Sequence, residues 1–259
     1  MFSKKFKPIF TAKNNLIRLG PKRDGGYVID KRIIRKIDHI ITCGLNDDWM
    51  FEKNFLKYSN KTNVLAYDHN VNSSFWLKRL FKDIIHFFLL KKLSFWKIIN
   101  IFGYLDYILF FKNKNKHFKI KVGKKNIPSK EITINEILKN KKKVLLKVDI
   151  EGAEYEILKD IKKNYKKINF LIIEFHSIKK NLKEINKFIS QIKDLKIIHI
   201  HGNNVQKIDK YGFPYAIELS FINSKLIKLQ PKKNFENYPI TKLDYPSVKR
   251  NEDIEIKFI

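Results

Sequence analysis

Side chains that could do acid–base chemistry follow several short apolar runs of this chain, at the point where each run ends. These groups are Cys43-Gly44, Asp68-His69, Asp149-Ile150-Glu151-Gly152, Glu174-Phe175-His176 and residues 199–204 (HIHGNN). If the runs are parallel strands, their carboxyl ends share one edge of a sheet, where α/β proteins bind ligands. Carboxylates and imidazoles are the side chains that most often transfer protons in enzymes. The sequence therefore predicts a catalytic site along this edge.

A glycine turn followed by an acid indicates a nucleoside ligand. Gly44 follows the run HIITC, and Asp68 ends the next run, 24 residues later. Glycine lets the backbone approach a ligand closely, and an acid about 20 residues beyond such a turn accepts hydrogen bonds from ribose hydroxyls. The alternative is that Asp68 caps a helix. The chain has neither the GxGxxG dinucleotide fingerprint nor the GxxxxGK phosphate loop, so dinucleotide binding and ATP hydrolysis have no support.

The elements that must position these groups alternate between strands and helices. Seven runs predict strands, at residues 39–44, 63–68, 118–123, 144–150, 168–175, 196–202 and 215–223, and helical patterns occupy residues 48–58, 154–165 and 181–195. Strands that alternate with helices in this way are typical of an α/β fold with a largely parallel sheet. Because most of the strands are apolar throughout, we expect helices on both faces of the sheet.

Residues 73–117 interrupt this alternation between the second and third strands. The segment is rich in aromatic residues and lysine, and its apolar residues recur at three- and four-residue spacing, which predicts helices. We interpret it as a helical insertion that forms a lid or a substrate-binding elaboration. Extra helices that enlarge the core, or a basic amphipathic surface that contacts a membrane, are the alternatives.

The composition is strongly basic. The chain has 259 residues and a formal net charge of +28, which favours an anionic partner. The alternative is a genomic bias, since the lysines are spread along the whole chain. A single cysteine, Cys43, excludes a disulfide framework and a cysteine-based zinc site. With no recognisable secretory signal and no apolar run of membrane-spanning length, we expect a cytoplasmic protein with one domain over residues 1–259, in which 73–117 is the insertion.

The stretch LLKVDIEGAEYEIL resembles the signature of the FkbM-type methyltransferase family. Further matches to a branch of that family with a DGGY-bearing N-terminal segment are RLGPKRDGGYVID, ITCGLNDDWMFEKNFL, IEFHSI, HIHGNN and LDYPS, in this order along the chain. The resemblance implies a Rossmann-like class I methyltransferase that uses S-adenosylmethionine and releases S-adenosylhomocysteine. It also implies O-methylation of sugars and related natural products.

The resemblance also implies which residues bind the cofactor. They are Arg18, Asp24, Gly25, Gly26, Tyr27, Cys43, Gly44, Asn46, Asp48, Asp68, His69 and Asp149. The first-strand turn is expected to hold the methionine part of the donor, and Asp68 is expected to accept from the ribose. The loop around Gly25 should close over the donor, where Arg18 is suited to a bidentate pair with the donor carboxylate.

Methyl transfer to a sugar hydroxyl needs a group that removes the hydroxyl proton. His176 is our candidate base, with Glu174 or Asp149 orienting its ring, and Asp149 and Glu151 are expected beside the sulfonium and the acceptor. Glu174, His201, Asn203 and Asn204 are the candidate substrate-binding residues, although residues 202–204 alone also fit a turn. Carboxylates and histidine bind Mg²⁺ or transition ions, but no compact ligand motif is present, so we expect no metal.

We therefore expect an O-methyltransferase whose acceptor is an anionic sugar, nucleotide-linked or phosphorylated, in capsule or other surface-glycan synthesis. Two alternatives are open. The first is an RNA methyltransferase, because aromatic residues amid lysines suit single strands, although no nucleic-acid motif is recognisable. The second is a non-catalytic basic scaffold at a membrane surface. We expect no specific nucleic-acid partner and no stable membrane insertion, and peripheral membrane contact is compatible with the sequence.

Overall fold

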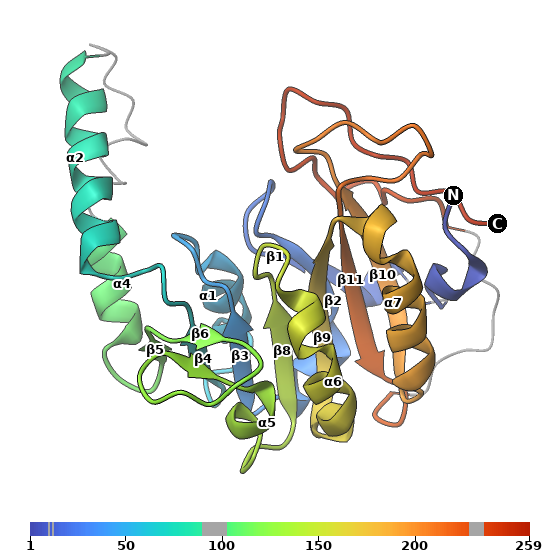
Figure 1. Ribbon diagram of the computed structural model, residues 1–259, viewed down its shortest axis with the longest axis horizontal. Helices are drawn as coiled ribbons and strands as arrows, with labels where there is room; N and C mark the ends of the chain where they lie inside the picture. The colour runs from blue at the N-terminus through green and yellow to red at the C-terminus, as the bar shows by residue number, and fades with distance from the viewer. Residues whose placement is uncertain (10, 12, 90–102, 228–235) are drawn as a thin grey trace.

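The computed structural model describes residues 1–9, 11, 13–89, 103–227 and 236–259 (Figure 1). Its centre is a seven-stranded sheet in the order β10-β11-β9-β8-β3-β4-β5. The strands are β3 (His39–Cys43), β4 (Asn63–Tyr67), β5 (Lys116–Phe118), β8 (Val144–Val148), β9 (Ile168–His176), β10 (Leu195–Asn203) and β11 (Ala216–Asn223). Only β11 of these strands runs against its neighbours. The predicted Rossmann-like, mostly parallel sheet is confirmed.

The strand order reverses direction at β3, and this places the site. β3 pairs in parallel with β4 on one side and with β8 on the other. Crossovers therefore leave the two sides of β3 in opposite directions, and a crevice opens beyond the carboxyl ends of the strands at such a switch point. The residues that end β3, β4 and β8 meet in this crevice.

Both faces of the sheet are covered, as the apolar strands predicted. Every residue of β8 and β9 is buried. The helices α6 (Glu154–Asn164) and α7 (Ile178–Gln191) lie in front of the sheet in Figure 1. The hairpin of β1 (Leu16–Leu19) and β2 (Tyr27–Asp30) lies behind it, where the Ser220 hydroxyl of β11 donates to the Val28 carbonyl at 2.7 Å.

Local sequence explains where the helices begin and how they face the sheet. The remaining helices next to the sheet are α1 (Met50–Leu56) and α5 (Ile134–Ile137). The Asp48 carboxylate accepts from the Met50 N–H, so α1 starts two residues later than the pattern predicted. In α7, Ile178, Ile185 and Phe188 recur at helical spacing and are buried. Short 3₁₀ turns are Lys4–Phe6, Lys13–Asn15, Lys31–Lys36 and Tyr165–Lys167.

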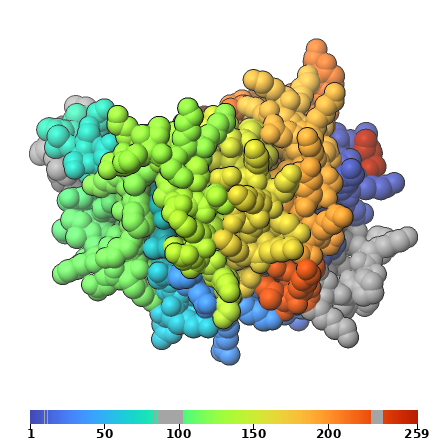
Figure 2. Space-filling view, turned by 60° about the horizontal axis from the view of Figure 1, so that its bottom comes forward, coloured from blue at the N-terminus to red at the C-terminus, as the bar shows by residue number. Residues whose placement is uncertain are grey.

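The segment between β4 and β5 is helical where the structure describes it. Its helices are α2 (Ser73–Leu89) and α4 (Gly103–Phe111), and residues 90–102 of the predicted insertion lie outside the described residues. The two helices form one end of the molecule in the space-filling view (Figure 2). No described helix is both long enough and apolar enough to cross a lipid bilayer.

The predicted boundary between the insertion and the third strand was wrong. β5 begins at Lys116, inside the range given to the insertion, and the strand predicted at 118–123 contains only its last residue. Residues Lys121–Val122 instead form β6, which pairs with β7 (Glu131–Ile132) outside the main sheet. The run KHFKIKV alternates between polar and apolar residues over 117–122, so its pattern does not fix where the strand begins, and pairing with β4 places the strand at Lys116–Phe118.

Candidate active site

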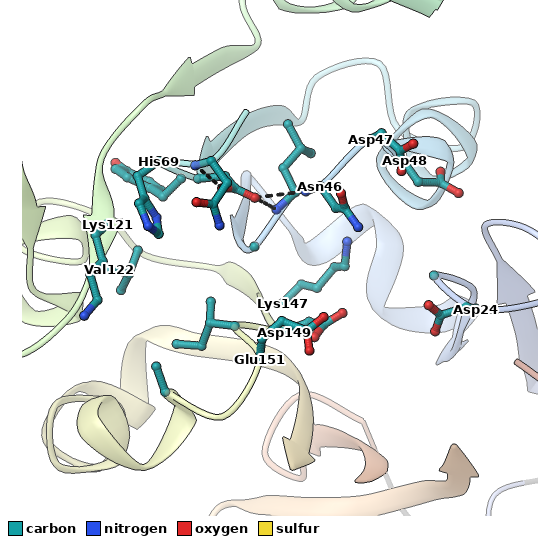
Figure 3. Close-up of a pocket in the computed structure, with 18 of the residues that line it drawn as sticks. Asp24, Asn46, Asp47, Asp48, His69, Lys121, Val122, Lys147, Asp149 and Glu151 are labelled. Atoms are coloured by element: carbon teal, nitrogen blue, oxygen red, sulfur yellow. Dashed lines mark hydrogen bonds between the residues drawn. The ribbon is translucent and has the colours of Figure 1, made fainter. Parts of the chain in front are cut away.

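A cavity of about 330 Å³ lies beyond the carboxyl ends of β3, β4 and β8. Its lining residues are Arg23, Asp24, Gly25, Tyr27, Gly44–Asp48, Tyr67–Asn70, Ile120–Val122, Lys147, Asp149–Glu151 and Ala153. Figure 3 shows His69, Lys121 and Val122 at one end and Asp24 at the other, with Lys147 and Asp149 between them. The volume lies within the usual range of small-molecule sites. Segments far apart in the sequence thus meet in one cavity, as expected.

Gly44 brings the first turn against the end of β8. Its φ is +84°, and a Cβ at this position would lie 1.7 Å from the Asp149 carbonyl oxygen. Only glycine fits both this backbone conformation and this close approach. The Gly44 N–H also donates to the Tyr67 carbonyl at 3.0 Å, so the turn is fixed to β4 as well.

Asp68 holds the same turn from the other side. Its Oδ2 accepts from the Leu45 and Asn46 N–H groups at 2.9 and 3.0 Å, and its Oδ1 accepts from the Asn70 N–H at 2.8 Å. A carboxylate has about four acceptor sites, so three backbone bonds leave room for one ribose hydroxyl. The cap of α2 is Asn72, whose Oδ1 accepts from the Phe75 N–H. Asp68 is therefore not a helix cap and orders the cavity wall.

The end of the cavity next to His69 has aromatic and aliphatic side chains in its wall. The Tyr67 ring stacks on Phe118 with centroids 4.8 Å apart and planes 15° apart. Ile120 and Val122 line the cavity beside it. An aromatic and aliphatic wall of this kind suits a planar base, and sequence reasoning missed it because the register of β5 and β6 was wrong.

Asp149 lies at the centre of the cavity floor. Its Oδ2 accepts from the Tyr27 hydroxyl at 3.2 Å. Burial raises the pKa of Asp149 to about 6, although the positive charges of Lys147 and His176 act in the opposite direction. A cationic ligand next to this carboxylate would lower the pKa again, because it stabilises the charged form.

Lys147 supplies a buried positive charge that sequence reasoning missed. Its Nζ donates to Glu52 Oε1 at 3.2 Å, and the Thr42 hydroxyl donates to the same oxygen at 2.6 Å. Burial lowers the pKa of Lys147, but the carboxylates of Glu52 and Asp149 outweigh this and keep the pKa above its ordinary value. The available signal was a lysine in the otherwise apolar strand VLLKV, which calls for a buried acid as partner.

His176 is held by Glu154, not by Glu174 or Asp149 as predicted. The distance from His176 Nδ1 to Glu154 Oε1 is 3.0 Å, and the same oxygen accepts from the Ile150 and Gly152 N–H groups. Because a carboxylate only accepts here, Nδ1 carries the proton in the neutral ring and Nε2 offers its lone pair. Glu154 was missed because it reads as an ordinary acid in the first turn of a helix.

The free ring nitrogen of His176 faces the acids at the cavity edge. His176 Nε2 lies 3.6 Å from Glu151 Oε2 and 3.8 Å from Glu174 Oε1. His176 is not itself a lining residue, but one ligand atom each of His176, Asp149 and Glu151 lie within 4.8 Å of one another. A proton acceptor is thus placed directly behind the two acids of the cavity floor.

Turnover should depend on pH through this histidine. Burial alone would lower the pKa of His176, but the hydrogen bond and charge of Glu154, with the charges of Asp149 and Glu151, raise it above 6.5. A base acts only when deprotonated, so kcat should rise with pH through a midpoint above that value. In Glu154→Gln the midpoint should move to lower pH. A kcat–pH profile tests this, and an unchanged midpoint in the variant would contradict it.

Carboxylates gather at this edge more densely than the sequence predicted. Ligand atoms of Asp24, Glu174 and Glu218 also lie within 4.8 Å of one another. Burial raises the pKa of Glu174 well above its ordinary value, and the charges of Asp149, Glu218 and Asp24 raise it further. Asp149, Glu151 and His176 form a second group of three. Each of the two groups has side chains of types that could bind a divalent ion. The expectation of no metal stays a prediction.

Arg18 and Gly26 organise the DGGY loop and do not line the cavity. The Arg18 guanidinium donates to the carbonyls of Pro21, Arg23 and Leu243. A Cβ on Gly26 would lie 2.7 Å from the same guanidinium. With three of its five N–H donors bound to backbone carbonyls, Arg18 positions the loop that carries Asp24 and Gly25. Because it does not line the cavity, the structure does not place it for a bidentate pair with a donor carboxylate.

Cys43 is also outside the cavity. It ends β3 in the core and has no exposed surface. Burial raises the pKa of its thiol to about 12, so it is a neutral core residue. The remaining implied cofactor-binding residues, Asp24, Gly25, Tyr27, Gly44, Asn46, Asp48, Asp68, His69 and Asp149, all line the cavity.

The candidate substrate residues have three different sets of partners. Asn203 Nδ2 donates to Glu174 Oε1 at 2.9 Å, so this pair lies beside His176. His201 lies 2.9 Å from Asp253 and 3.4 Å from Glu218. The amide of Asn204 donates to the carbonyls of residues 248, 251 and 252 and is used by the C-terminal segment. None of these four candidate residues lines the cavity, and Asn204 has a structural role.

Comparison with known proteins identifies one family. The family model described as methyltransferase FkbM domain matches residues 43–198. No curated protein matches the chain significantly. Among solved structures, the chain is similar to the methyltransferase FkbM of Methylobacillus flagellatus KT, at 14% identity and a TM-score of 0.41 over 71% of this chain. The match spans 44% of that protein's length.

Two other solved structures are similar over more of their own length. M. jannaschii TYW2, crystallised with AdoMet, matches at 14% identity and a TM-score of 0.33, over 83% of this chain and 90% of its own. A putative caffeoyl-CoA O-methyltransferase from Staphylococcus aureus matches at 10% identity and a TM-score of 0.34, over 73% and 78%.

Proposed function

The chain belongs to the FkbM methyltransferase family, and from this premise we propose that it transfers a methyl group to a hydroxyl of a sugar. Its cofactor is S-adenosylmethionine, which leaves as S-adenosylhomocysteine. The observation that carries the proposal is the position of His176, with Nδ1 fixed by Glu154 and Nε2 directed toward the edge of the cavity. A hydroxyl needs a base of this kind, because it is a poor nucleophile at neutral pH.

The cavity offers each part of the cofactor a suitable wall. The turn at Gly44 lets the backbone come close to the methionine portion. Asp68 has an acceptor site for a ribose hydroxyl, and the wall of Tyr67, Ile120 and Val122 suits the adenine. The Asp149 carboxylate at the centre favours a positive charge there.

The residues of the site would then divide the reaction among them. When bound, S-adenosylmethionine supplies the methyl group from its sulfonium. His176 accepts the hydroxyl proton on Nε2 as the new carbon–oxygen bond forms, and Glu154 stabilises the resulting imidazolium through Nδ1. The walls of the cavity hold donor and acceptor in line, and such positioning supplies a large part of the rate of a two-substrate reaction.

The charge of the chain supports an anionic acceptor. The formal net charge is +28, which draws phosphate-bearing molecules toward the protein. Arg23 and Lys121 line the cavity itself. We therefore favour a phosphorylated or nucleotide-linked sugar, of the kind used in capsule or other surface-glycan synthesis.

The experiment that tests the proposal uses the purified chain with methyl-labelled S-adenosylmethionine. It is offered nucleotide sugars and sugar phosphates in one set of reactions and bulk RNA in another. We expect label in the sugar fraction and a mass gain of one methylene on the sugar. Label that enters RNA and no sugar would overturn the sugar assignment and favour an RNA methyltransferase.

A further inference from the structure

The helices α2 and α4 carry apolar side chains that face solvent. On α2, Leu77, Phe81 and Ile85 follow one another at four-residue spacing, so they form one stripe, and each is more than half exposed. On α4, Leu105 and Leu109 share this spacing, and Leu109 is 70% exposed. Contiguous exposed apolar residues of this kind mark interaction surfaces. We call these two helices the arm.

The arm is fixed to the body of the protein by its opposite side. The Trp76 ring of α2 lies 6.2 Å from Trp49 and 5.0 Å from Tyr107 of α4, measured between centroids. The Trp49 Nε1–H donates to Asp106 Oδ2 at 3.0 Å, and Lys53 pairs with the same carboxylate. The inner side of the arm thus already has partners within the protein, whereas the side chains of the apolar stripes are exposed.

The arm also starts at the edge of the cavity. Asn70 lines the cavity, and α2 begins three residues later at Ser73. Figure 1 shows α2 and α4 standing away from the sheet at one end of the molecule. The first turn of the arm therefore lies near the cavity, and its apolar stripe continues along α2 away from the sheet.

Charge decides which partner the arm fits. Lys78 and Lys82 are exposed on α2 beside the apolar stripe, and Lys112 is exposed just after α4. A helix with an apolar face and flanking lysines binds in the interface of an anionic bilayer. A second copy of this chain fits less well, since two molecules of net charge +28 repel each other.

We propose that the arm binds the surface of an anionic lipid bilayer, with the stripes of α2 and α4 in the headgroup region and the lysines on the phosphates. The inference is independent of methyl transfer, because it rests on exposure and charge and not on the cavity. It makes the chain a peripheral membrane protein.

The test is co-sedimentation of the full chain with vesicles of phosphatidylcholine alone or mixed equally with phosphatidylglycerol. We expect binding to the mixed vesicles that is much stronger than to the neutral ones. The double variant Phe81→Asp with Leu109→Asp should lower the partition coefficient by about tenfold or more. The matched control is Val205→Asp with Ile208→Asp, both 55% exposed and outside the arm, which changes the net charge equally.

Each other outcome would overturn the proposal. If the chain does not bind the mixed vesicles, the arm does not bind a membrane. If both double variants lose the same amount of vesicle binding, net charge alone causes the binding. Light scattering on the free protein tests the other occupant: a dimer that only the arm variant dissociates, without lipid binding, would assign the arm to a second copy. Circular dichroism of both variants checks that they fold, and failure of lipid binding leaves cofactor binding unaffected.

Discussion

Replacing His176 with glutamine is expected to lower kcat by about 10²–10⁴-fold and to leave the affinity for S-adenosylhomocysteine unchanged. The reason is that His176 is not itself a lining residue of the cavity, and its Nε2 lies 3.6 Å from Glu151 Oε2, where we place the acceptor. Glutamine keeps a hydrogen-bonding side chain of similar reach but cannot take a proton. Turnover of labelled donor and calorimetric titration of the product cofactor measure the two quantities separately.

His199 provides the matched control for this prediction. It is also buried, on strand β10, which β11 separates from β9, and its Nε2 lies 3.1 Å from Asp244. His199→Gln should reduce stability but retain kcat in the fraction that folds. Comparable losses of kcat in both variants would mean that His176 is structural, and the base would have to be sought elsewhere.

Replacing Gly44 with alanine is expected to abolish cofactor binding and to destabilise the fold by about 2–5 kcal/mol, from a positive φ and an overpacked contact together. The new Cβ would lie 1.7 Å from the Asp149 carbonyl oxygen and 2.8 Å from its carbonyl carbon, both backbone atoms that cannot rotate away. The turn and the end of β8 must therefore separate. Thermal unfolding and titration with S-adenosylhomocysteine are the measurements.

Gly152 distinguishes the cost of a positive φ from the cost of the close contact. Its φ is +101°, but a Cβ there would meet no atom within 4 Å. Gly152→Ala should therefore carry only the conformational cost of about 1–2 kcal/mol and should keep cofactor affinity within a few-fold. If Gly44→Ala and Gly152→Ala behave alike, the close contact between the turn and β8 is not what shapes the cavity.

The fold could be predicted from the sequence because the residue pattern of its central strands indicates buried strands clearly. The runs that became β3, β8 and β9 are mostly apolar, and nearly all of their residues are buried. The edge strand β5 is different, since it is short and alternates in pattern, so its register depends on β4 and not on its own residues. The boundary of the insertion was misplaced for the same reason.

The site residues at strand ends could be predicted from the sequence. The residues whose role depends on a contact partner could not. Gly44, Asp68 and Asp149 line one cavity because the topology brings their strand ends together. Arg18 was expected to bind the donor, but three backbone carbonyls already use its guanidinium. Glu154 was not expected at all, because the contact that matters is with His176, 22 residues away. Such pairings depend on packing, which spacing does not reveal.

Isothermal titration calorimetry of the unmodified chain with S-adenosylhomocysteine tests the central claim most directly, because the claim is that one cavity at the ends of β3, β4 and β8 holds the cofactor. We predict saturable binding of one molecule per chain, lost in Gly44→Ala and kept in His176→Gln. The absence of any binding heat at millimolar ligand, with protein shown to be folded, would contradict the account.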